Sequence, residues 1–238
     1  MEKNFIAGGI SGIFEVLITH PIDYLKVKKQ EFRQLNKNFK FKEMKYNECV
    51  KSIIPRLLGV APMRIIFWGA QDNTKLLLEN NNIKSNYNFI VIGMVSGFFQ
   101  SILDNPIEVI KIGTMTNQNS KDIFKSTINF KGFNATLLRN TGFTICMSYF
   151  CFNDNGNNKV FNSILGGLSG SILTQPLDFV KTQQQRSNDT RNIIKIIKDT
   201  MRESPKKLFV GGYYRCLLSI SSMSIGFIFY DYFKNFLN

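Results

Sequence analysis

Apolar residues form six segments separated by polar connections, at roughly 4–29, 53–77, 87–115, 134–153, 160–185 and 212–236. Crossing the hydrocarbon core of a bilayer takes about 20 helical residues, and each segment reaches that length. Acids, amides and arginines interrupt these segments. Such mixed faces are typical of helices that line a water-filled cavity and turn their apolar residues towards lipid. The pattern therefore predicts an all-α membrane protein with six transmembrane helices.

One short motif occurs in the first, third and fifth segments. A proline is followed by an acid two residues later and by a lysine five residues later, at 21–26, 106–111 and 176–181. Small residues stand 13 and 9 positions before each proline: Gly8 and Gly12, Gly93 and Gly97, Ser163 and Gly167. Coincident spacings of this kind indicate internal repeats. We predict a single domain, 1–238, made of three repeats at 1–82, 83–158 and 159–238.

The second half of each repeat also has recurring features. An arginine opens its apolar segment, as Arg56, Arg139 and Arg215. An acid followed by a lysine three residues later ends the first and third repeats, at 72–75 and 231–234. An aromatic-basic-glycine element, Phe130-Lys131-Gly132, precedes the fourth segment.

With these motifs the whole chain resembles a short member of the mitochondrial carrier family. The resemblance implies three modules related by pseudo-threefold symmetry. Each module would have two transmembrane helices and a short helix along the matrix surface. The activity implied is exchange of a solute across the mitochondrial inner membrane by alternating access, with salt-bridge gates.

The charge pattern distinguishes this membrane interpretation from a soluble one. The chain carries a formal net charge of +13 and its mean hydropathy is −0.08, which would also suit a soluble nucleic-acid-binding protein. The excess lies in alternate connections, however: 26–51, 111–131 and 181–207 carry +6, +3 and +5, whereas 73–88 and 153–162 are near neutral. This is the positive-inside asymmetry. It places both termini on the intermembrane-space side, and we expect no nucleic-acid partner.

Other classes of site have little support. The four cysteines show no CxxC pair, so neither a zinc site nor a disulfide framework is expected. The sequence has no phosphate-binding glycine loop, catalytic-triad spacing or metal cluster, and we expect no enzyme activity, no metal and no cofactor. No cleavable signal is expected before Phe5, because the apolar segment begins almost at the first residue.

The tripled motif predicts a gate. The acid and the lysine of each motif are three residues apart, so they share one face of a helix. The resemblance implies a matrix gate at the helix kinks made by Pro21, Pro106 and Pro176, with Asp23 paired to Lys111, Glu108 to Lys181 and Asp178 to Lys26. A partly hydrated pair contributes about 1 kcal/mol, which substrate binding could offset. Gln30 and Gln185 could brace the first and third pairs, whereas Met115 at the equivalent position cannot. The alternative is a static ion-pair network.

A cytoplasmic gate is less complete in the sequence. The resemblance pairs Asp231 with Lys75. Asp72 and Lys234 would need partners on the fourth segment, which ends without an acid-x-x-Lys arrangement. Asp154 or Lys159 could substitute, although their register is wrong. We expect a weaker seal on this side.

The resemblance also implies substrate contact points at Gly59, at Arg139 with Asn140, and at Leu218, or at Ser219 if the register is shifted by one. Arg139 is the best candidate for an anion contact, because an unpaired arginine at mid-membrane is unfavourable. Glu15 and Gln100 each stand six residues before a motif proline and should face the cavity. Arg64 could add a further cation. Alternatively, Glu15 and Arg139 pair with each other across the cavity.

Three substrate classes fit these residues. Nucleotides would use arginine for phosphate and the space beside Gly59 and Leu218 for a base, and they are our first expectation. Amino acids would use an arginine-acid pair, but Asn140 replaces the acid. Carboxylates would use several basic residues, and only Arg139 is clear. A proton-leak or receptor protein on the same scaffold is the alternative without exchange.

The last basic connection predicts a surface helix over 188–199. Ile193, Ile194, Ile196 and Ile197 would share one face, opposite Lys195 and Lys198. Its N-terminus could hold a lipid phosphate, and the resemblance implies cardiolipin. A solvated connector is the alternative. We expect a monomer whose partners are a small anionic substrate and membrane lipid.

Overall fold

A computed structural model describes residues 2–34, 46–83, 85, 87–152, 159–186 and 191–237. The helices are α1 (Glu2–Gln34), α2 (Tyr46–Asn80), α3 (Asn88–Met115), α4 (Ser120–Ile128), α5 (Phe133–Phe152), α6 (Lys159–Leu173), α7 (Gln175–Arg186), α8 (Ile193–Glu203) and α9 (Gly212–Leu237), with a 3₁₀ turn, η2 (Pro205–Phe209). The part of the chain that is described contains no strand. The prediction of an all-α fold is confirmed, and the expected repeat boundaries, which stay a prediction, fall between α2 and α3 and between α5 and α6.

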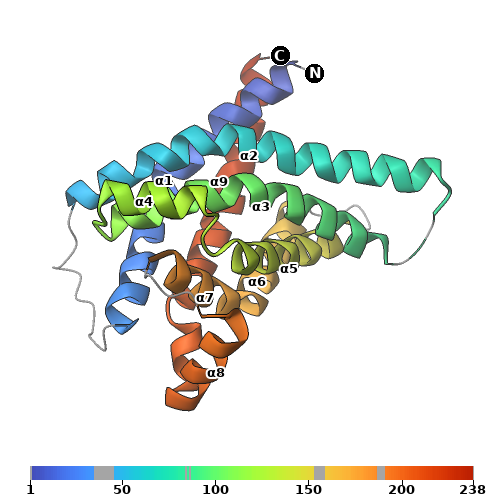
Figure 1. Cartoon of the computed structure of the whole chain (residues 1–238). Helices are drawn as coiled ribbons and strands as arrows, with labels where there is room; N and C mark the ends of the chain where they lie inside the picture. The colour runs from blue at the N-terminus through green and yellow to red at the C-terminus, as the bar shows by residue number, and fades with distance from the viewer. Residues whose placement is uncertain are drawn as a thin grey trace.

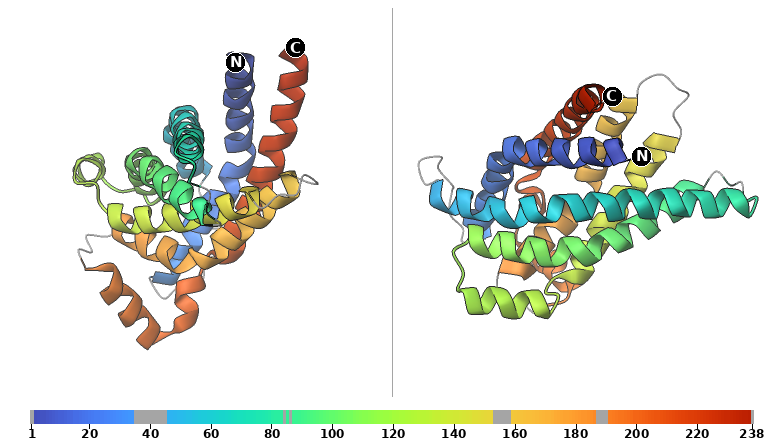
Figure 2. Two further views of the ribbon diagram at one scale, coloured as in Figure 1. Left: turned by 90° about the vertical axis from the view of Figure 1, so that its right-hand side faces the viewer. Right: turned by 90° about the horizontal axis from the view of Figure 1, so that it is seen from above.

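The long helices contact one another in a closed cycle. In chain order α1 packs on α2, α2 on α3, α3 on α5, α5 on α6 and α6 on α9, and α9 returns to α1. The two termini consequently lie side by side at one end of the molecule (Figures 1 and 2). The helices that carry the three motif prolines, α1, α3 and α7, also contact one another. This meeting point positions the charged residues described below.

The three motif prolines act differently on their helices. Helices α1 and α3 continue through Pro21 and Pro106, whereas the fifth segment is divided into α6 and α7 at Thr174, two residues before Pro176. Proline lacks an N–H donor and its ring clashes with the preceding turn, so it weakens the helix at that point. Of the three motif prolines, only Pro176 therefore lies beside a break in its helix.

Only α3, within the described residues, is long and apolar enough by itself to cross a membrane; the apolar stretch Val160–Leu173 is shorter. The other long helices carry more charge. In a cyclic arrangement each helix needs apolar residues on its outer face alone, which lowers its mean hydropathy.

Close packing between α3 and α5 depends on the small residues recognised in the sequence. A Cβ atom added at Gly93 would lie 2.6 Å from the Ile145 Cα atom, and one at Gly97 would lie 2.7 Å from the Thr141 Cα atom. The hydroxyl of Thr144 donates to the Gly93 carbonyl at 2.5 Å. The two helix backbones can approach this closely only because neither glycine has a side chain.

The predicted surface helix exists as α8, which begins at Ile193; residues 187–190 lie outside the described part. Ile196 is fully buried, and Ile193 and Ile197 pack around it. Ile194 is 73% exposed although it lies beside Ile197, so the four isoleucines share one side of α8 and only part of that side packs against the protein. Four isoleucines within five positions extend further around the helix than its contact with the rest of the protein does. Helix α4 is the corresponding short helix of the second repeat.

Candidate functional site

Three ion pairs join α1, α3 and α7 where these helices meet. Lys111 Nζ lies 2.8 Å from Asp23 Oδ2, Lys181 Nζ lies 2.5 Å from Glu108 Oε2, and Lys26 Nζ lies 2.6 Å from Asp178 Oδ2. We call these six residues the charged ring. Each pair links two repeats, and the structure brings together all six residues in the pairings expected from the sequence.

The ring is more deeply buried than expected. No side chain in its three pairs is more than 10% exposed. The estimate of about 1 kcal/mol per pair suits hydrated pairs. Removing one partner of a buried pair destabilises a protein by about 3–5 kcal/mol, because the other charge is left buried and uncompensated. Loss of one partner of a ring pair would therefore be more unfavourable than the sequence indicated.

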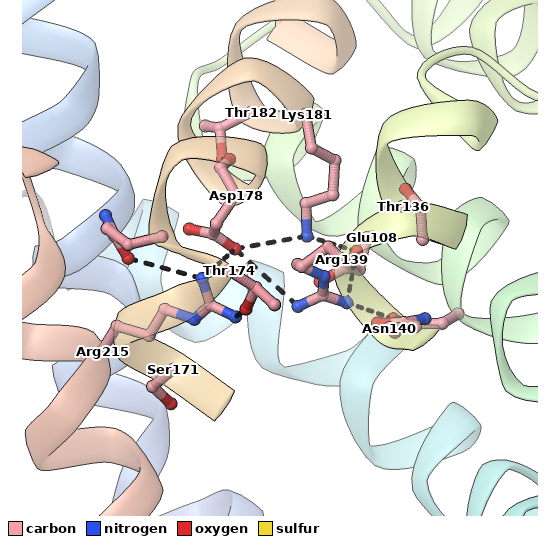
Figure 3. Close-up of polar contacts among 12 residues, drawn as sticks. Glu108, Thr136, Arg139, Asn140, Ser171, Thr174, Asp178, Lys181, Thr182 and Arg215 are labelled. Atoms are coloured by element: carbon pink, nitrogen blue, oxygen red, sulfur yellow. Dashed lines mark hydrogen bonds and ion pairs between the residues drawn. The ribbon is translucent and has the colours of Figure 1, made fainter. Parts of the chain in front are cut away.

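An arginine from each of α2, α5 and α9 extends the ring. Arg56 Nη1 lies 3.1 Å from Asp23, Arg139 Nη2 lies 3.4 Å from Glu108, and Arg215 Nη1 lies 3.9 Å from Asp178. Figure 3 shows Asp178 between Arg215 on one side and Arg139 with Lys181 on the other. Sequence reasoning gave a role to Arg139 alone. The recurrence of an arginine at the start of each second segment was the signal that could have identified Arg56 and Arg215.

Arg139 contacts three carboxylates, contrary to the expectation of an unpaired cation. Besides Glu108, its guanidinium lies 2.5 Å from Asp104 and 3.7 Å from Asp178. The amide of the adjacent Asn140 donates to the same Asp104 oxygen at 3.0 Å. Asp104 was not predicted as a site residue. The structure thus places the two residues of the second contact point on one buried carboxylate.

The two glutamines behave differently. Gln30 Nε2 donates to Asp178 Oδ2 and to the Val210 carbonyl, both at 3.3 Å, so it does brace the Lys26–Asp178 pair. Gln185 Nε2 instead donates to Asn105 Oδ1 at 3.0 Å. The prediction that it braces a ring pair is wrong, because the asparagine before Pro106 provides a nearer acceptor. Met115 is fully buried in an apolar cluster.

The remaining predicted contacts that the structure describes are buried or half-buried. Gly59 is buried against the side chain of Ile107 on α3. Leu218 is half-buried, and its neighbour Ser219 shares a hydrogen bond of 2.6 Å with Ser171. Gln100 is also half-buried. In this conformation the space expected beside Gly59 is filled by a side chain.

Glu15 is buried and faces α9. The hydroxyl of Ser222 donates a hydrogen bond to its carboxylate, and the side chain is accordingly held at the α1–α9 contact. Arg139 makes its own ion pairs with acids of α3 and α7. These contacts contradict the alternative in which Glu15 and Arg139 pair with each other.

The cytoplasmic gate stays a prediction. Lys75 is exposed and its Nζ lies 3.9 Å from Glu79 of the same helix. The side chains of the other residues considered for this gate lie outside the described part of the chain: Asp72, Asp154, Lys159, Asp231 and Lys234. The side chain of Arg64, a predicted substrate contact, also lies outside it.

Known proteins resemble this chain over most of its length. Residues 1–82 and 153–238 match the sequence profile of a family described as mitochondrial carrier protein. The chain is 27% identical over 225 residues to the mitochondrial 2-oxodicarboxylate carrier of Bos taurus, covering 77% of this chain and 75% of that protein. It is 29% identical over 248 residues to the mitochondrial carnitine carrier of Saccharomyces cerevisiae, covering 83% and 75%. It is 26% identical over 282 residues to the mitochondrial aspartate-glutamate transporter of the same yeast, covering 98% of this chain but 31% of that protein.

Proposed function

The chain belongs to the mitochondrial carrier family, and on that premise we propose that it exchanges small anionic metabolites, foremost dicarboxylates, across the mitochondrial inner membrane. The charged ring serves as the matrix gate in its closed state. Both termini lie on the intermembrane-space side, in keeping with the basic connections on the opposite side. Substrate binding opens the ring by replacing part of the attraction that holds its pairs together.

The observation that carries the proposal is the charge balance around Arg139. The described cluster contains six cations and four carboxylates, a net charge of +2: Lys26, Arg56, Lys111, Arg139, Lys181 and Arg215, against Asp23, Asp104, Glu108 and Asp178. A dianion would neutralise this excess. The planar guanidinium of Arg139 matches a carboxylate in geometry, and Asn140 adds a neutral donor beside it. The names of the 2-oxodicarboxylate carriers support the same class.

Nucleotides, the first expectation from the sequence, are our second candidate. The three arginines of the cluster favour them, because phosphate groups accept hydrogen bonds from several guanidiniums at once. The packing of Ile107 against Gly59 disfavours them, since a base would have to displace that side chain. Amino acids are a third candidate, with the carboxylate of Asp104 beside Arg139 available to an ammonium group.

Uptake into liposomes tests the proposal. Purified protein is reconstituted into liposomes preloaded with a 2-oxodicarboxylate, and exchange against external dicarboxylates, nucleotides and amino acids is measured. We expect saturable dicarboxylate exchange that Arg139→Ala abolishes and that Lys195→Ala, which removes an exposed cation of α8, leaves intact. Exchange of nucleotides or amino acids without dicarboxylates would overturn the substrate class. Collapse of a pH gradient with no counter-substrate would show a proton leak instead.

A further inference from the structure

The residue two positions before each motif proline occupies equivalent surroundings in the three repeats. These residues are Thr19, Asp104 and Thr174. Each accepts a hydrogen bond from the Nη2 atom of its own repeat's arginine: Arg56 to Thr19 at 3.5 Å, Arg139 to Asp104 at 2.5 Å, and Arg215 to Thr174 at 2.5 Å. Two repeats thus offer the arginine a neutral hydroxyl, and the second repeat offers a carboxylate. The three repeats therefore differ in the charge of the group that accepts the arginine's hydrogen bond.

The carboxylate of Asp104 accepts hydrogen bonds from both Arg139 and the amide of Asn140. The threonine hydroxyls donate to their own helix, to the Glu15 carbonyl and the Gly170 carbonyl, each at 2.7 Å. They bring no charge to the arginine. Ionised Asp104 only accepts hydrogen bonds. The same oxygen takes both the Arg139 guanidinium and the Asn140 amide, and its side chain is 7% exposed.

We propose that Asp104 is a specificity-determining residue that acts as an internal counter-carboxylate for the transported anion. While the charged ring is closed, Asp104 occupies the donors of Arg139 and Asn140. An anion that enters the cavity must displace it from them. The displaced carboxylate remains nearby and lowers by one unit the positive charge that the substrate meets. The carrier consequently prefers dianions to trianions, and this inference rests on the proposed transport of small anions.

The test compares anions that differ in charge. Asp104→Asn keeps the shape of the side chain and removes the charge, and Asp104→Thr restores the residue found in the other two repeats. Ser101→Ala is the matched control, because it removes another hydrogen-bond partner of Asn140, at 3.1 Å, without changing any charge. For each variant, KM and kcat are measured in liposomes with a dicarboxylate and a tricarboxylate of similar size. The increase in melting temperature that each anion produces is measured in detergent.

We expect the preference for the tricarboxylate over the dicarboxylate to rise roughly fivefold or more in both Asp104 variants, since one repulsive charge has been removed near the anion. Ser101→Ala should leave that ratio unchanged. If Asp104 merely holds Arg139 in place, the ratio stays at the wild-type value in both Asp104 variants, which would overturn the inference. Loss of amino-acid uptake in Asp104→Asn, with the anion ratio unchanged, would also overturn it, because Asp104 would then bind an ammonium group.

Failure of the proposed function looks different from failure of this inference. A wild-type protein that transports neither anion would contradict dicarboxylate transport. In that case the increase in melting temperature produced by each anion still measures whether the cavity binds the dicarboxylate or the tricarboxylate more strongly. Should Asp104→Asn fail to fold, Asp104→Thr decides the question, because Thr19 and Thr174 show that a threonine fits this position beside an arginine.

Discussion

Charge reversal of the Asp23–Lys111 pair should restore transport only in part. Each single change, Asp23→Lys or Lys111→Asp, places like charges together in a site where no side chain of the pair is more than 10% exposed. Removing a buried partner already destabilises by about 3–5 kcal/mol, so each single variant should lose a stable closed gate. The double variant regains the attraction between positions 23 and 111. It leaves the new lysine facing Arg56, which lies 3.1 Å from Asp23 in the wild type.

A third change distinguishes this residual repulsion from a general loss of packing. Adding Arg56→Gln to the double variant removes the like charge and should raise the exchange rate above that of the double variant. The expected order is wild type, triple, double, then either single. The assay is the initial exchange rate in liposomes at equal amounts of reconstituted protein, with the melting temperature in detergent as a measure of the closed state.

An exposed ion pair provides the control. Arg191 Nη1 lies 2.9 Å from Asp199 Oδ2, with side chains 40% and 36% exposed, and reversing either charge there should change stability by about 1 kcal/mol or less. Single ring variants as active as the wild type would refute the gate. A double variant equal to or better than the triple would show that Arg56 does not act on position 23.

Three further changes test other parts of the structure. Arg139→Ala should abolish uptake and also lower the melting temperature, because it leaves three carboxylates without their shared cation; unchanged stability would show that those carboxylates find other partners. Glu15→Gln can keep the hydrogen bond from Ser222, so the protein should fold while the pH profile or the substrate preference of exchange changes, and a variant equal to wild type in both would make Glu15 a passive polar residue. Gly97→Val should lower the free energy of unfolding by about 1–3 kcal/mol through overpacking against α5, measured beside Gly69→Ala, where an added Cβ meets no atom within 4 Å.

Features that repeat along the chain were predictable from the sequence. The tripled proline-acid-lysine spacing predicted that three helices meet at their charged residues, and the resemblance to the carrier family supplied which acid pairs with which lysine. The positions of the six long segments followed from their apolar content. The internal repeats thus indicated contacts between residues far apart in the sequence, which a sequence without repeats does not reveal.

Features that differ between repeats were not predictable. Asp104 stands where the other repeats have threonine, and nothing in the local sequence indicated that Arg139 and Asn140 would both reach it. Gln185 was assigned by analogy with Gln30, but Asn105 competes for its amide, whereas the residue before Pro21 is a histidine that contacts Cys49 and Ser52. Such outcomes depend on which of several nearby partners is closest in space.

The way the charged ring crosses the repeats has a consequence for biosynthesis. Of its three pairs, only Asp23–Lys111 lies within the first two repeats; Lys26 and Glu108 find their partners on α7. Until its last third has been inserted, a nascent chain therefore holds Lys26 at membrane depth without its ring partner, whereas Glu108 already has Arg139 of the second repeat 3.4 Å away. Unpaired charges are unfavourable in a bilayer. Membrane insertion must accordingly shield Lys26, or deliver the final repeat before the first two settle, and a chain truncated after the second repeat would expose a recognisable defect to quality-control proteases.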